Sequence, residues 1–118
     1  EQDLIKANEN RAERPWILVA AHRPMYHSTT INTELQAAVE ELFYKYGVDM
    51  YITGHVHSYE RNYPTYQGVP EKTYNDPRAP AHVLVGGAGN DEMKDVPNND
   101  VSAPGPWTVV TDGNYGIG

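Results

Sequence analysis

Histidines are the side chains of this sequence best suited to chemistry, and three of the five follow apolar runs. His55 and His57 come just after the run 50–52, and His22 ends the run 16–21. On an extended backbone, residues two apart point to the same side, so the imidazoles of His55 and His57 should face one pocket. Gly54 would let the chain turn or approach closely there. Since neutral imidazole is the commonest metal-binding side chain, the pattern predicts a metal site.

Two further polar residues lie on the segment that follows His22. His27 can protonate a leaving group or bind a substrate oxygen, or it can simply be solvated. Arg23 can contact phosphate, or it can pair with a nearby carboxylate. The acidic residues of the loop 91–106 lack a place at the end of a strand and are not expected to be ligands.

The residues around the histidines are expected to support them. Tyr59, Glu60 and Arg61 should brace the histidine segment through an internal ion pair and packing, and His82 should be structural. No helical pattern follows the glycine-rich run 86–90, which argues against a phosphate-binding loop. These glycines are expected instead to allow close backbone passage beside the metal site.

The arrangement of the predicted elements places the histidines together. A strand over 16–21 precedes a helix that begins at an N-cap, Thr33, and ends at Gly47, and a second strand spans 48–53. Strand, helix and strand in this order predict two parallel neighbours, whose carboxyl ends share one edge of a sheet. Ligands bind at that edge in such folds, and His22 and His55 both lie there.

The remaining pattern predicts one α/β domain over residues 1–118. A polar helix should cover residues 1–12, a hairpin or irregular excursion 62–80, and strands 81–85 and 107–111, with a hairpin signal at Asp112-Gly113. Continuous apolar runs such as 16–21 are typical of strands buried on both faces. Both ends of the sequence read as if they were cut from a longer chain.

Composition excludes several classes of function. A net charge of −7 argues against nucleic-acid binding, which needs a basic face. No apolar run is long enough to span a bilayer, so no membrane partner is expected. There are no cysteines, so any metal must be held by nitrogen and oxygen.

The histidine segments resemble those of a known family. Residues 19–22 and 54–57 are similar to two of the five metal-site blocks of the calcineurin-like metallophosphoesterases. The longer strings 16–26 and 54–61 resemble the purple acid phosphatases in particular, as do 86–90 and 115–118. The resemblance covers nearly the whole chain. It implies a β-sandwich flanked by helices (α-β-β-α) that hydrolyses phosphomonoesters at acidic pH through a dinuclear metal site.

The resemblance also implies roles for the histidines. His22 and His55 would bind a divalent ion (zinc, manganese or iron), and His57 would bind iron(III). A histidine on the segment after His22 usually assists the leaving group in this family, although in plant members it lies further along than His27. A secreted, extracellular or vacuolar location is implied by the family only.

The family's other ligand blocks do not occur in this sequence. The chain is therefore expected to be the C-terminal part of the catalytic domain, with the N-terminal half absent and little activity of its own. Two alternatives stay open. One is a non-catalytic fragment with weak or no metal binding, and the other is a mononuclear zinc hydrolase built on three histidines.

Overall fold

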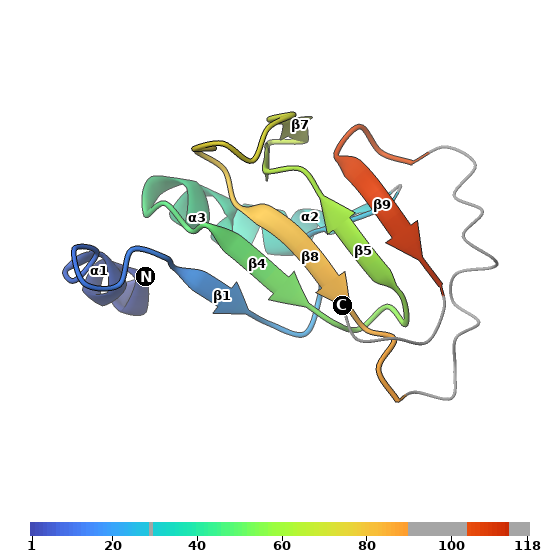
Figure 1. Cartoon of the computed structure of the whole chain (residues 1–118), viewed down its shortest axis with the longest axis horizontal. Helices are drawn as coiled ribbons and strands as arrows, with labels where there is room; N and C mark the ends of the chain where they lie inside the picture. Colours follow the sequence, from blue (N-terminus) through green and yellow to red (C-terminus); the bar gives the residue numbers. More distant parts are fainter. Residues whose placement is uncertain (29, 90–103, 114–118) are drawn as a thin grey trace.

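A five-stranded mixed sheet is the centre of the structure, a computed structural model that describes residues 1–28, 30–89 and 104–113 (Figure 1). Three parallel strands lie at one side of the sheet, and two antiparallel strands complete it. In spatial order they are β1 (Leu18–Ala20), β4 (Met50–Thr53), β8 (Ala81–Val85), β5 (Tyr59–Asn62) and β9 (Thr108–Asp112). The predicted α/β class, the four strands and the parallel pairing of the first two are confirmed.

Short helices and two hairpins complete the described part of the chain. The helices are α1 (Gln2–Asn8), α2 (Thr33–Leu35), a π-helical turn η1 (Gln36–Glu40) and α3 (Glu41–Lys45). The hairpins pair β2 (Tyr26–His27) with β3 (Thr30–Ile31), and β6 (Thr65–Tyr66) with β7 (Val69–Pro70). Among the described residues, no helix has the length and apolarity that crossing a bilayer would require.

The central helix begins one residue earlier than its sequence pattern predicts. Asn32, not Thr33, is the N-cap: its backbone is extended and its side chain accepts a hydrogen bond from the Leu35 amide at 3.1 Å. Gly47 ends the helical segment with a φ of 62°, as predicted, because this left-handed conformation favours glycine. The π-helical turn in between leaves the Glu40 side chain buried, which the apolar pattern did not indicate.

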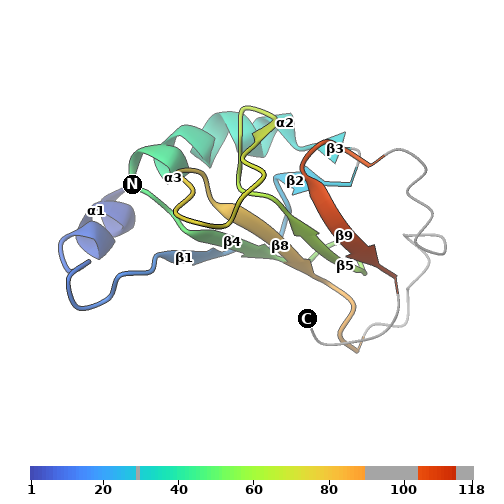
Figure 2. The same ribbon diagram turned by 45° about the horizontal axis from the view of Figure 1, so that its top comes forward.

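Only one face of the sheet is covered by described elements (Figure 2). On the covered face, Tyr51 of β4 and Leu84 of β8 are buried, and the ring of Tyr51 packs against that of Phe43 in α3. On the other face, Leu18 of β1 is 59% exposed. The prediction that the run 16–21 is buried on both faces is therefore wrong for this chain, because β1 is an edge strand and one of its faces lacks a described cover.

The core lies between the helices and the sheet. Its buried apolar members come from the segments at β1, β2, α3 and β4 and from the residue before β9: Ile17, Met25, Tyr26, Phe43, Val48, Tyr51 and Trp107. Tyr26 is the polar centre of this cluster, since its hydroxyl donates to Glu40 and accepts from the Gly68 amide at 2.9 Å. Burial, reinforced by Glu40, raises the pKa of the Tyr26 hydroxyl, so it remains a neutral donor.

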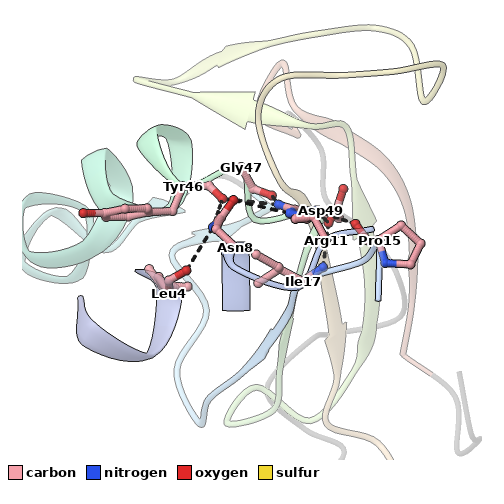
Figure 3. Close-up of polar contacts among 8 residues, drawn as sticks. All are labelled: Leu4, Asn8, Arg11, Pro15, Ile17, Tyr46, Gly47 and Asp49. Carbon is pink, nitrogen blue, oxygen red and sulfur yellow. Dashed lines mark hydrogen bonds and ion pairs between the residues drawn. The ribbon is translucent and has the colours of Figure 1, made fainter. Parts of the chain in front are cut away.

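Arg11 ties the N-terminal segment to the end of the helix (Figure 3). Its guanidinium donates to the Gly47 carbonyl, to the Tyr46 carbonyl at 3.2 Å and to Asp49 at 2.9 Å. Asp49 in turn accepts the Ile17 amide at 2.7 Å. One cation therefore satisfies helix-end carbonyls and the carboxylate that precedes β4.

Replacing Arg11 by methionine should lower the free energy of unfolding by about 2 kcal/mol. Each hydrogen bond to a charged group contributes ~1.5–3 kcal/mol, but part of this loss is offset because the carbonyls that Arg11 leaves can bind water instead. Urea unfolding followed by far-UV circular dichroism would measure the change. Arg14→Met is the matched control because Arg14 is exposed. Equal stability of the two variants would contradict a clamping role for Arg11.

His82 is a buried histidine at the start of β8. It is 3% exposed and lies edge-on to the rings of Tyr26 and Tyr51, at centroid distances of 4.9 and 5.8 Å. Neither ring nitrogen makes a hydrogen bond of normal geometry to the described residues. Burial lowers the pKa of His82 from 6.5 to about 4, opposed in part by the nearby backbone of Thr65. The predicted structural role of His82 agrees with this setting.

Acidification should therefore destabilise the chain through His82. The unfolded state takes up its proton near pH 6.5 and the folded state only near pH 4, so folded-state stability is present above this window and is lost as the pH falls through it. The expected loss between pH 7 and pH 4 is roughly 3 kcal/mol. His82→Leu should remove that part of the pH dependence in urea titrations at several pH values. Identical pH slopes in both proteins would contradict this assignment.

Candidate metal centre

Two of the predicted histidines meet at the carboxyl edge of the parallel strands. His55 Nδ1 lies 3.1 Å from His22 Nε2, and the two rings are edge-on with centroids 4.9 Å apart. The backbone between β1 and β4 holds them there, since the Ala21 amide donates to the Ile52 carbonyl and the Gly54 amide to the His22 carbonyl. The predicted juxtaposition of His22 and His55 is confirmed.

The segment that carries His55 and His57 is bent, not extended. His55 has a φ of 71°, and amide-to-carbonyl bonds run from Val56 to Gly54 and from Ser58 to Val56. The turn thus occurs at His55, and the space around a Cβ placed at Gly54 is open. The prediction that Gly54 provides a close approach is wrong. The backbone at His55 is not extended, so the expectation that the imidazoles of His55 and His57 point to the same side no longer follows from strand geometry.

His57 does not form a three-residue metal site with His22 and His55 in this structure. Within residues 1–28, 30–89 and 104–113, no group of three or more histidine, aspartate or glutamate side chains lies close enough to hold a metal. His22 and His55 are therefore a two-nitrogen pair, and the metal role of His57 stays a prediction. Residues 91, 92 and 95 and the terminal 115–118 lie outside the described residues.

A hollow of about 200 Å³ opens beside the histidine pair. It is lined by the two other predicted site residues, Arg23 and His27, together with His55. The remaining lining residues, which sequence reasoning did not single out, are Pro24, Met25, Thr30, Asn32 and Val56. Arg23 is exposed and makes no ion pair with a carboxylate of the described part of the chain, while its carbonyl accepts from Tyr51 at 2.8 Å. The fold thus brings a guanidinium and two imidazoles to one opening.

Glu60 lies next to His27, and its partners differ from the internal ion pair that the sequence predicts. It is 1% exposed, it accepts the Ser28 amide at 2.5 Å and the Ser28 hydroxyl at 2.7 Å, and its Oε2 lies 3.6 Å from His27 Nε2. The predicted internal ion pair with Arg61 is wrong, because neighbours on a strand point to opposite faces. Arg61 instead lies over the ring of Tyr74 at 5.3 Å. Only its adjacency to the histidine segment pointed to Glu60 in the sequence.

Gly86 provides the close backbone approach that the glycine-rich run was predicted to allow. A Cβ at this position would lie 1.8 Å from the Val56 carbonyl oxygen and 3.4 Å from His57 Cα. The Gly86 amide also donates to the Ser58 carbonyl at 2.9 Å. Glycine is required here because the chain after β8 passes directly over the histidine segment.

This fold and this site agree with one protein family. The model of the calcineurin-like phosphoesterases matches residues 1–59, and that of the iron/zinc purple acid phosphatase-like protein C matches residues 79–118. The chain belongs to the calcineurin-like phosphoesterase family. The match of residues 79–118 relates the chain to the purple acid phosphatases in particular.

Proteins with similar sequences are named acid phosphatases or purple acid phosphatases. The chain is 41% identical to acid phosphatase type 7 of Homo sapiens, with 98% of this chain and 30% of that protein covered. It is 36% identical to purple acid phosphatase 18 of Arabidopsis thaliana, with 98% and 25% covered. A purple acid phosphatase from yellow lupin seeds superposes with a TM-score of 0.66 at 25% identity, over 98% of this chain and 22% of that one. The chain thus spans at most about a third of these relatives.

Gly86→Ala should disturb the histidine segment. Its methyl group would overlap the Val56 carbonyl, so the free energy of unfolding should fall by about 2–4 kcal/mol. Gly54→Ala is the matched control, because a Cβ there meets nothing within 4 Å. Thermal and urea unfolding of both variants would measure the difference. A Gly86→Ala protein as stable as Gly54→Ala would show that the close approach is not rigid.

Proposed function

We propose that this chain is part of a metal-dependent acid phosphatase that hydrolyses phosphomonoesters through a dinuclear centre. The observation that carries the proposal is the pairing of His22 with His55, beside a hollow lined by Arg23 and His27. Membership of the calcineurin-like phosphoesterase family supports the reaction class. By the resemblance, the metals would be iron(III) and a divalent ion, zinc, manganese or iron.

The paired nitrogens fit a divalent ion. Two imidazole nitrogens that lie 3.1 Å apart are close enough together to bind one ion, and imidazole is a common ligand of divalent metals. By the resemblance, His22 and His55 would hold the divalent ion and His57 would hold iron(III). When bound, such ions act as Lewis acids that neutralise charge on phosphoryl oxygens and lower the pKa of water.

The chain's own residues would bind and orient the substrate. Arg23 carries a permanent positive charge at the hollow and would bind a phosphate oxygen, because no carboxylate of the described residues neutralises it. His27 lines the same hollow and would donate a proton to the leaving-group oxygen. Both roles need the phosphate to lie near His55, on the side where the hollow opens.

The rest of the catalytic domain is the proposed partner. Among the described residues, no third histidine, aspartate or glutamate lies close to the His22–His55 pair, so the remaining ligands of the centre would come from elsewhere in a longer protein. The open face of the sheet, with Leu18 at its edge, is a surface that such a segment would cover. The chain by itself would then have little phosphatase activity. A secreted or vacuolar location is proposed from the family alone.

Two other functions predict different behaviour toward metal. A mononuclear zinc hydrolase would need three histidines on one ion, and the two-histidine pair of this structure speaks against it. A non-catalytic fragment would bind metal weakly or not at all. The histidines that a bound zinc ion requires therefore separate the three-histidine zinc site from the other two functions, and a complete absence of binding would favour the non-catalytic fragment.

Isothermal titration of the purified chain with zinc should show about one weak site, since two imidazoles of fixed geometry remain. His22→Ala and His55→Ala should each abolish this binding. His57→Ala should leave it within about threefold, because His57 is assigned to the other metal.

Each contrary result has a definite meaning. Loss of zinc binding in His57→Ala equal to that in His55→Ala would favour the three-histidine zinc site. No binding by the unaltered chain, verified as folded by circular dichroism, would favour the non-catalytic fragment.

A further inference from the structure

A buried carboxylate stands directly behind the proposed proton donor. Glu60 is 1% exposed and belongs to β5, whereas His27 belongs to β2 and has a side chain 25% exposed. Thirty-three residues of sequence separate the two, and the fold brings Glu60 Oε2 to 3.6 Å from His27 Nε2. We propose that Glu60 is a positioning residue that keeps a proton on His27 Nε2 and so leaves Nδ1 to serve the hollow. The catalytic meaning of this arrangement rests on the proposed function.

The Glu60 carboxylate is fixed in place by one neighbouring residue. The Ser28 amide donates to Oε1 at 2.5 Å and the Ser28 hydroxyl donates to Oε2 at 2.7 Å. Ser28 is itself held from the other side, because its carbonyl accepts the Gly105 amide at 2.6 Å and the Thr108 hydroxyl at 3.3 Å. A carboxylate with two charge-assisted hydrogen bonds in a buried site cannot reorient freely.

His27 Nε2 faces the Glu60 carboxylate. The atom is shielded from solvent and has no hydrogen-bond partner among the described residues. At 3.6 Å the contact with Glu60 is longer than a hydrogen bond, and it is an ion pair when the imidazole is protonated. A buried N–H that faces a carboxylate is stabilised, whereas a bare nitrogen lone pair facing it would be repelled.

The two ring nitrogens therefore have separate tasks. His27 lines the hollow, whereas Glu60, which Nε2 faces, does not, and we therefore assign Nδ1 of His27 to a substrate in the hollow. In the proposed step the oxygen of a water molecule that has lost a proton forms a bond to phosphorus while the ester phosphorus–oxygen bond breaks, and the imidazolium gives its Nδ1 proton to the leaving-group oxygen. His27 then becomes the neutral form with its proton on Nε2, still facing Glu60.

Nitrogen-15 NMR of the labelled chain tests the arrangement without any need for activity. Two-bond couplings identify which ring nitrogen bears the proton at about pH 8, above the ordinary pKa of histidine. His27→Gln assigns the signals by their disappearance. The expected result is His27 protonated on Nε2 in the unaltered chain. In Glu60→Gln, the Nε2 signal should move toward that of an unprotonated nitrogen.

Ser28→Ala is the matched control, because it removes one hydrogen bond to Glu60 and keeps the charge. It should lower the stability but leave the His27 ring signals in place. Unchanged His27 signals in a folded Glu60→Gln chain would reduce Glu60 to a structural role and overturn the proposal. If Glu60→Gln does not fold, the unaltered and Ser28→Ala chains decide: a proton on Nε2 in both supports the proposal, and one on Nδ1 overturns it.

This test and the metal titration fail independently. A chain that binds no zinc can still keep the proton on His27 Nε2, which would sustain the positioning role of Glu60 and remove the proposed phosphatase. The reverse pair of results would keep the metal centre and remove the role of Glu60.

Discussion

The parallel pairing of β1 with β4 is the constraint on which the site depends. Its register sets Ala20 beside Ile52, and the hydrogen bonds continue past both strand ends to join His22 with Gly54. Parallel strands end at the same edge, so the backbone brings together two histidines that are 33 positions apart in the chain. The 3.1 Å contact between His22 and His55 follows from this backbone arrangement.

The loops at that edge are held by close packing and by buried polar contacts. Gly86 lets the chain after β8 pass against the Val56 carbonyl, which fixes the bent segment that carries His55. Ser28 links the β2 hairpin to Glu60 on β5 and to the segment before β9. Elements from both family-matched regions therefore support one opening, because Gly86 and Gly105 lie in the C-terminal match and His22 and His55 in the N-terminal one.

Described elements cover only one face of the sheet. Its helix-facing side carries the core and the buried His82, whereas the side that includes Leu18 has no cover among the described residues. An apolar sheet face stabilises a protein when another layer covers it, so the run 16–21 has a composition suited to more burial than this chain provides. This agrees with a chain that spans 30% of the length of acid phosphatase type 7.

The sequence by itself did not predict β5 or the spatial order of the strands in the sheet. It did predict the other four strands, the parallel pairing of the first two and the edge at which His22 and His55 meet. These follow from local patterns, because apolar runs, a helix stop at Gly47 and the handedness of a strand–helix–strand unit leave few alternatives. The tertiary structure alone decided the left-handed turn at His55, the partner of Glu60 and the open face of the sheet. Each depends on contacts between residues far apart in the chain, and no local preference of a side chain encodes such contacts.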